Sequence, residues 1–328
     1  MIKQIQNYPS IIARPYIRAS KKDAQWKDNQ RYTFESLVTV LASYAVSDLL
    51  NVYMTLREPV ESGEGDISEE DLEIIESLKN IENLKSIGLE QMSLGKWCAV
   101  LRETTKVLKD HQDKSFIPEL YKNFQPPSNK LWDDINSLVK QRNDDAHGVP
   151  ISDSELKKVL NSRQEILDRI LEQCAFLENY SISIFEKLVL KSNSQQVSGK
   201  SFVNDGQESI LVPADLEPPL GEILLVNHSK KFTFIKLRPL IVYAPVNGQE
   251  SRQLSLYSKQ LDKEGNQIHY LGVDGAVDVD VKLFDKKYNQ SLGQRWKHIH
   301  EIYSEEDVQI PNLNGNINVA SSIEINEE

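Results

Sequence analysis

Residues 131–148 read LWDDINSLVKQRNDDAHG, and the chemical character of this stretch changes halfway along. Its first half carries apolar residues at the spacing of one helix face: Leu131, Ile135, Leu138 and Val139. Its second half, residues 141–145, is entirely polar or charged, and Gly148 then supplies a helix-stop signal. The stretch therefore predicts a helix that buries one face in a core and carries Arg142 and His147 near its C-terminal end.

The polar residues near this helix end have side chains suited to a phosphodiester. Arg142 carries a permanent charge and can hold two phosphate oxygens at once. His147 titrates near neutral pH, so it can act as a general base or a general acid. Asn143 can orient either group through hydrogen bonds. We expect Lys140 and Gln141, just before them in the chain, to contribute to substrate binding.

The order Arg142, Asn143, three further residues and His147 resembles the motif of the HEPN superfamily of helical domains. Two earlier segments, SLGKWCAVLRET (93–104) and FIPELYKNF (116–124), look like those that precede the motif in HEPN-like domains of bacterial defence and signalling proteins. The resemblance covers about residues 1–190. It implies a ribonuclease site built from the Arg and the His, which needs no metal or other cofactor and is usually shared across a homodimer.

Helix geometry bears on how Arg142 and His147 can meet. Residues five apart on a regular helix differ by about 140° in direction and about 7.5 Å along the axis. The two groups can converge if the helix tightens or ends before Gly148, or a second copy can supply the missing group across a two-fold axis. With RNA as substrate, the expected products are a 2′,3′-cyclic phosphate and a 5′-hydroxyl.

A structural role for the same motif is the alternative. Asp144 and Asp145 can pair with Arg142 or Lys140, and His147 can cap a helix C-terminus. The neighbouring carboxylates would also repel RNA unless they turn away or are neutralised. In this interpretation the chain is a non-catalytic scaffold or adaptor that dimerises and binds a partner effector protein.

The rest of the chain predicts an α+β protein with two domains. Residues 1–190 are expected to form a HEPN-like helical domain. Its first 25 residues are expected to be irregular, and the helical bundle follows them. Helical periodicity or N-cap serines mark the remaining helices, over about 31–56, 69–84, 94–110, 117–124 and 152–189. Asp48, on the otherwise apolar helix 31–56, is a candidate buried partner of Arg142.

A change of composition marks the predicted second domain. Residues 191–210 are rich in Ser, Asn, Gln and Gly and are interpreted as a linker. Residues 211–328 are then expected to form a small β-rich domain of about five antiparallel strands, followed by a helix over 287–303 and a frayed acidic tail. Within that helix, QRWKHIH (294–300) is interpreted as a basic aromatic patch on the surface or against a partner.

Bulk composition excludes several classes of protein. The chain has 328 residues, of which 39% are hydrophobic, without a run of eighteen apolar residues or a signal-peptide core. Cys98 and Cys174 lie in apolar surroundings without zinc spacing, which predicts buried thiols in the cytoplasm. The net charge of -11 argues against a broad basic surface for nucleic acid, but it permits a small local phosphate site or docking to a basic partner.

Overall fold

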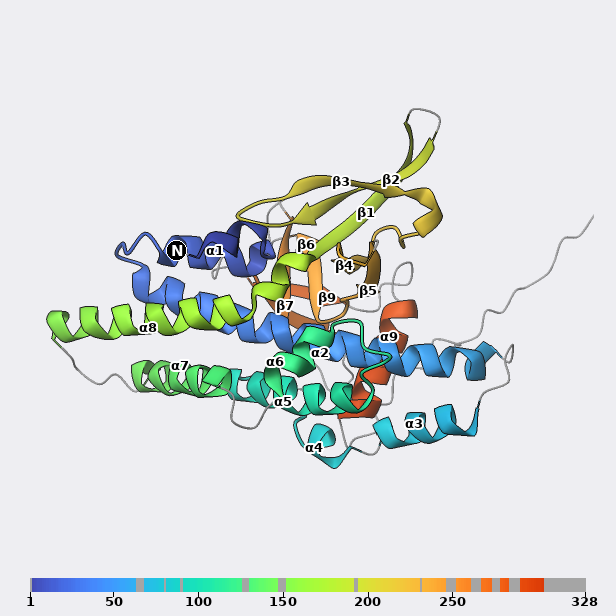
Figure 1. Ribbon diagram of the computed structural model, residues 1–328, viewed down its shortest axis with the longest axis horizontal. Coiled ribbons are helices and arrows are strands. Elements are labelled where there is room, and N and C mark those ends of the chain that lie inside the picture. The colour runs from blue at the N-terminus through green and yellow to red at the C-terminus, as the bar shows by residue number, and fades with distance from the viewer. Residues whose placement is uncertain are drawn as a thin grey trace, which may run out of the picture.

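The computed structural model has helices in its N-terminal half and antiparallel strands in its C-terminal half, which confirms the predicted α+β class (Figure 1). The residues that the structure describes are 2–62, 68–79, 81–88, 91–125, 130–146, 152–191, 194–230, 232–245, 252–260, 267–272, 278–282 and 290–303. The tail predicted over 309–328 lies outside these ranges.

Helix α2 (Trp26–Ser62) is the central element of the fold. It runs through the middle of the molecule, with α5 and α7 on one side and the strands on the other (Figure 1). It contacts helices α1, α5, α8 and α9 and strands β5 and β7. Every residue from 37 to 50 is buried, including Asp48. The predicted helix is thus confirmed and is longer than expected, but its middle has no solvent-exposed face.

Most of the remaining helices follow the sequence prediction. Their N-caps are confirmed at Ser93, whose hydroxyl accepts from the Lys96 amide, and at Ser152, which forms a capping box with Glu155. The helix predicted over 69–84 is instead two helices, because Ile81 is extended and is the N-cap residue of the second. The bounds of the helices other than α2 and α9 are α1 (Ser10–Ala19), α3 (Glu69–Lys79), α4 (Glu82–Lys85), α5 (Leu94–Asp110), α6 (Pro118–Phe124), α7 (Lys130–Ala146) and α8 (Asp153–Gln173).

Two further predictions of helix boundaries are wrong. The segment expected to be irregular over residues 1–25 contains α1, in which Ile11, Ile12 and Tyr16 are fully buried and Pro15 is tolerated. The helix expected to reach about residue 189 ends at Gln173, and the chain enters strand β1 (Tyr180–Lys191). The alternation of Ser and Ile after Tyr180 has the two-residue period of a strand.

Nine strands in the described part of the chain form two antiparallel sheets, where about five strands were expected. The order is β3-β2-β1-β4-β5 in the first sheet and β6-β7-β8-β9 in the second. The bounds of the other strands are β2 (Ser194–Phe202), β3 (Glu208–Pro213), β4 (Ile223–Asn227), β5 (Thr233–Lys236), β6 (Ile241–Pro245), β7 (Arg252–Gln260), β8 (Gln267–Gly272) and β9 (Asp278–Lys282).

The linker predicted over residues 191–210 is therefore wrong, because most of it forms β2 and the start of β3. Within β2 its polar residues are exposed only at the start of the strand, and from Val197 onward the strand is buried or half-buried. Alternate residues of β1 explain how the sheet joins the helices: Ile182 and Ile184 belong to a core shared with the helices, and Phe185 packs on the opposite face. The same core continues into the second sheet through Leu254 and Ile268.

The C-terminal helix α9 (Gln290–Tyr303) is confirmed, but the interpretation of QRWKHIH as a surface patch is wrong. Trp296, Ile299 and Tyr303 are almost fully buried, and α9 packs against α2, α3 and α4. A polar cluster closes one side of this contact. Glu301 accepts hydrogen bonds from Arg57 (2.7 Å) and from the Tyr53 hydroxyl (3.0 Å), and its carboxylate lies 3.1 Å from a ring nitrogen of His298.

We expect the contribution of Glu301 to stability to disappear in acid. Burial alone would raise the pKa of this carboxyl, but the hydrogen bond with His298 and the charge of Arg57 outweigh burial and lower the pKa to about 2. The stabilisation is then present above the unfolded pKa near 4.5 and is lost as the pH falls toward 2.

Glu301→Gln should accordingly lower the free energy of unfolding by about 2 kcal/mol at pH 7. The difference from wild type should shrink as the pH falls from 5 to 3 in urea titrations. Glu172→Gln, at an exposed site on α8, is the matched control and should stay within about 0.5 kcal/mol of wild type. A penalty for Glu301→Gln that did not change with pH would contradict the assignment.

Within the described residues, one helix passes the length and composition test for a membrane span, residues 26–57 of α2. Of its most apolar window, 89% is buried inside the fold. Burial of this kind is what the core helix of a soluble protein shows, and the structure is consistent with a soluble protein.

Candidate functional site

The last two turns of α7 carry most of the residues that the sequence singles out. The helix is fixed in the fold because Leu131, Ile135 and Leu138 are buried and because it packs against α6 and α8. Arg142 follows on a half-buried position, so its side chain leaves the core along the surface of α2.

The guanidinium group of Arg142 is tied to the protein at one edge. Its Nε donates to Oε1 of Glu35 on α2 at 3.1 Å, and its Nη1 donates weakly to the Asn143 side chain at 3.4 Å. The side chain of Arg142 remains 41% exposed. Among the described residues no acceptor faces its Nη2 group. The guanidinium group is thus paired with Glu35 while a large part of the side chain stays exposed.

Arg142 forms part of the wall of two separate hollows. The first, of about 240 Å³, is polar and is lined by charged residues alone: Lys27, Asp28, Arg31, Arg142 and Asp145. Two helices, α2 and α7, supply these side chains. The hollow thus brings three cations and two carboxylates to one place on the surface.

Ion pairs organise this polar hollow. Asp145 accepts from Arg163 of α8 at 2.9 Å and lies 3.1 Å from Lys27 of α2, so one carboxylate links three helices. Burial would raise the pKa of Asp145, but the hydrogen bond and charge of Arg163, with those of Lys27, lower it. Arg31 lies 3.3 Å from Asp28 one turn earlier on the same helix. The Asp145 carboxylate is hence a fixed anion that locks the end of α7.

The structure separates the other predicted site residues. Lys140 and Asn143 are exposed. Gln141 is turned toward α8, where its Oε1 accepts from Arg163 at 3.2 Å, so it serves packing between helices. His147 lies outside the described residues, as does Gly148.

The expectation that Asp48 is the partner of Arg142 is wrong. Its carboxylate accepts three hydrogen bonds from the segment between α5 and α6: from the Ser115 hydroxyl (2.8 Å) and from the amides of Phe116 (2.7 Å) and Ile117 (2.9 Å). Burial raises the pKa of Asp48, and these three bonds oppose the rise. Asp48 therefore holds a loop in place, and Glu35 takes the role expected of it beside Arg142.

Sequence reasoning missed Lys27, Arg31 and Glu35. Their spacing of four residues sets all three along one face of α2, which is a signal visible in the sequence. The interpretation of this helix was instead based on its apolar residues. The spacing alone does not show that this face meets the end of α7.

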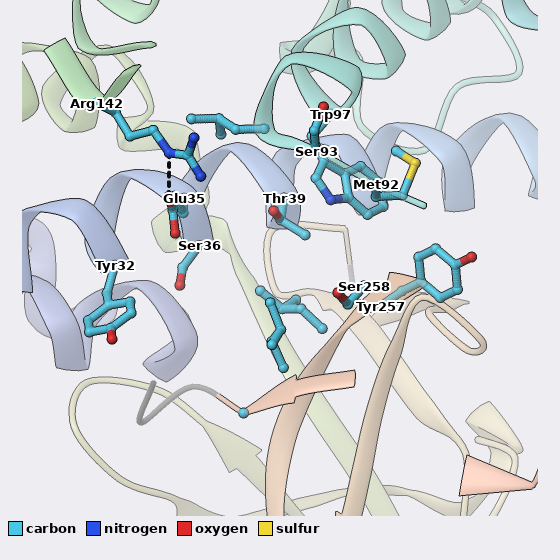
Figure 2. Close-up of a pocket in the computed structure, with 14 residues that line it drawn as sticks. Tyr32, Glu35, Ser36, Thr39, Met92, Ser93, Trp97, Arg142, Tyr257 and Ser258 are labelled. Carbon is cyan, nitrogen blue, oxygen red and sulfur yellow. Dashed lines mark hydrogen bonds and ion pairs between the residues drawn. The ribbon is translucent and has the colours of Figure 1, made fainter. Parts of the chain in front are cut away.

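The second hollow, of about 220 Å³, lies between α2, α5 and α7 on one side and β7 and β8 on the other. Figure 2 shows Arg142 at one end of it and Trp97 and Tyr257 toward the other. Trp97 is 4% exposed and Tyr257 1%, and their rings meet at right angles, 6.3 Å between centroids. The polar and the apolar hollow are thus neighbours that share one arginine.

Comparison with known proteins adds no family to this description. No protein-family model, no curated protein and no solved structure matches the chain.

Over the residues that the structure describes, no group of three or more His, Cys, Asp or Glu side chains is arranged to hold a metal ion. Cys98 and Cys174 are free, half-buried and buried respectively.

Proposed function

We propose that this chain is a cytoplasmic endoribonuclease that cuts RNA through Arg142 and His147 without a metal ion, as its resemblance to the HEPN superfamily implies. The observation that carries the proposal is the group of three cations, Lys27, Arg31 and Arg142, around one polar hollow. Cations from two helices that face the same space can hold a single phosphodiester by charge-assisted hydrogen bonds. A local site of this kind does not need the broad basic surface that the net charge of -11 argues against.

The proposed reaction is an internal transfer at phosphorus. A neutral imidazole of His147 takes the proton of the 2′-hydroxyl, and the 2′-oxygen forms a bond to phosphorus. The bond from phosphorus to the 5′-oxygen breaks, and an imidazolium gives a proton to that oxygen. Arg142 stabilises the charge that builds on the non-bridging oxygens. The products are a 2′,3′-cyclic phosphate and a 5′-hydroxyl, and no electron donor or acceptor is involved.

A homodimer is part of the proposal. Arg142 and His147 are five residues apart, and a regular helix would direct them to different places. A second copy can supply the missing group if two motifs meet across a two-fold axis. The β-rich part would then restrain the enzyme or dock a regulatory partner, as in a toxin or an antiviral defence component.

One observation favours the second candidate, a non-catalytic scaffold that binds an effector protein. Each cation of the polar hollow already has a carboxylate within 3.1 to 3.3 Å: Lys27 with Asp145, Arg31 with Asp28, and Arg142 with Glu35. RNA would have to bind beside these carboxylates, which repel it. If the ion pairs hold the helices together and bind nothing further, the motif is structural.

RNA cleavage in the presence of EDTA distinguishes the two candidates. Purified protein should cut single-stranded RNA of mixed sequence and leave 2′,3′-cyclic phosphate ends, detected by mass spectrometry of the fragments. DNA of the same sequence and RNA methylated at every 2′-oxygen are the matched substrates, and both should stay intact because they lack the attacking hydroxyl. Intact RNA under all conditions, or equal cutting of the methylated RNA, would refute the proposed mechanism.

A further inference from the structure

The hollow between the helices and the second sheet is small, with an apolar end and a charged end. It is lined by residues of α2, α5 and α7 on one side and of β7 and β8 on the other. Its volume is about 220 Å³, below the roughly 300–1,000 Å³ of sites for drug-sized ligands. The size of the hollow therefore suits a small metabolite.

The apolar end is a wall of mostly buried side chains. Leu94, Trp97 and Leu256 are 9%, 4% and 6% exposed, and all three line the hollow. Leu271 of β8 lines it as well and is 50% exposed. An aliphatic group that enters the hollow would leave water and would cover Leu271 at the same time, which favours binding.

The charged end presents both signs of charge to the same space. Arg142 and Glu35 line the hollow as an ion pair, with Nε and Oε1 joined at 3.1 Å. Their side chains are 41% and 31% exposed. A guanidinium has five N–H donors and a carboxylate has about four acceptor positions, so one hydrogen bond between them leaves both able to contact a ligand. This end accordingly favours a ligand that carries an anion and a cation close together.

Thr39 of α2 lines the hollow between these two ends (Figure 2). The residue is only 8% exposed, and within the described part of the chain its hydroxyl has no hydrogen-bond partner. Two other buried helical threonines, Thr33 and Thr105, donate to the carbonyl four residues earlier at 2.6 and 2.7 Å. Since buried polar groups in proteins are nearly always paired, the Thr39 hydroxyl is a group that a ligand would satisfy.

We propose that this hollow binds a free aliphatic α-amino acid such as leucine. The carboxylate of the ligand contacts Arg142, and its ammonium group contacts Glu35 and the Thr39 hydroxyl. The aliphatic side chain lies along the apolar wall and covers Leu271. An α-amino acid carries its two charges on neighbouring atoms of one small molecule, which matches an ion pair beside an apolar wall. The proposal concerns binding and does not rest on RNA cleavage.

Calorimetry on the full chain, without RNA, tests the proposal. L-leucine, L-isoleucine and L-valine are titrated separately, and at least one should bind at submillimolar concentration. Three comparison ligands each lack one part of the amino acid that binds most tightly. The matching carboxylic acid lacks the ammonium group, the amide lacks the carboxylate, and glycine lacks the side chain. Each should bind at least about tenfold more weakly, because each loses one of the three contacts.

Glu35→Gln should have effects of opposite sign on two of these ligands. The amino acid should bind about tenfold more weakly, because its ammonium group loses an ionic partner. The matching carboxylic acid should bind several-fold more tightly, because a neighbouring negative charge is removed. Arg142→Gln should make the amino acid and its amide bind equally. A purely structural effect of either substitution would weaken all the ligands alike.

Thr39→Val tests the unpaired hydroxyl with little change of side-chain shape. It should weaken binding of the amino acid by about fivefold, whereas the matched control Thr33→Val, at a hydroxyl bonded within α2, should change it by less than about twofold. The melting temperature of each variant shows whether it is folded.

Two results would overturn the proposal. One is that none of the three amino acids binds at about 1 mM. The other is that the wild-type chain binds the matching carboxylic acid as tightly as the amino acid, because the hollow would then recognise no ammonium group. Since RNA cleavage is not measured, failure here is distinct from failure of the ribonuclease proposal.

Discussion

Replacing His147 by alanine is expected to lower the rate of RNA cleavage by about 10³-fold, because a positioned general acid or base usually contributes 10²–10⁴-fold. Arg142→Ala should lower it by about 10²–10³-fold, the usual effect of removing one group that stabilises transition-state charge. Both rates are measured with labelled RNA in EDTA under single-turnover conditions. Arg142→Ala should lose no more than about 1 kcal/mol of stability, because Arg142 does not belong to the apolar face of α7.

Each of these variants has a matched control elsewhere in the chain. His111→Ala removes a half-buried histidine at the C-cap of α5, and Arg102→Ala removes an arginine that is 54% exposed and paired with Glu103. Both controls should cleave RNA at the wild-type rate. Equal cleavage by His147→Ala and His111→Ala would show that a contaminant cuts the RNA or that His147 is structural.

A mixture of the two inactive variants tests whether the site is shared. If Arg142 of one copy acts with His147 of the other, a mixed dimer contains one complete site, and an equimolar mixture should recover about a quarter of the wild-type rate. If both groups act within one copy, the mixture stays inactive. This experiment also separates a catalytic dimer from a dimer that only scaffolds, because the scaffold permits association without recovery.

Local signals in the sequence predicted most of the helices. The hydroxyl caps at Ser93 and Ser152 depend on residues three positions away, so their helix starts could be found from the sequence. The apolar spacing of α7 likewise predicted its buried face. Strand β1 was missed because its alternating Ser and Ile residues begin soon after a strongly periodic helix, with a short 3-10 helix (Ala175–Asn179) between the two.

Tertiary contacts decided what local signals could not. Pro15 reads as a helix breaker, yet α1 forms because its apolar residues are buried in the shared core. The cations Lys27 and Arg31 are more than 110 residues from Arg142 in the chain, and only the packing of α7 beside α2 brings them to one hollow. Arg142 was predicted from its motif. Its partner Glu35 could not be predicted, because the sequence contains several carboxylates that are equally good candidates.

Asp48→Ala should be the most destabilising substitution near the candidate site, lowering the free energy of unfolding by about 3–5 kcal/mol. The Asp48 side chain is fully buried and accepts three hydrogen bonds from the segment between α5 and α6. Alanine would leave two backbone amides and the Ser115 hydroxyl without their acceptor, and each unsatisfied buried group costs about 1–3 kcal/mol. Urea unfolding followed by circular dichroism measures the change.

Two companion variants separate lost hydrogen bonds from a simple change of volume. Asp48→Asn keeps one carbonyl oxygen as acceptor but turns an amino group toward donors, so its loss should fall between those of wild type and Asp48→Ala. Ser115→Ala removes one donor and leaves the two amide bonds, and should cost about 1 kcal/mol. If Asp48→Ala cost no more than Ser115→Ala, the carboxylate would not be what holds the loop.

A double variant tests whether Asp48 and Arg142 interact. A contact between them would make the losses of stability from Asp48→Ala and Arg142→Ala non-additive. The structure predicts additive losses, because Arg142 pairs with Glu35.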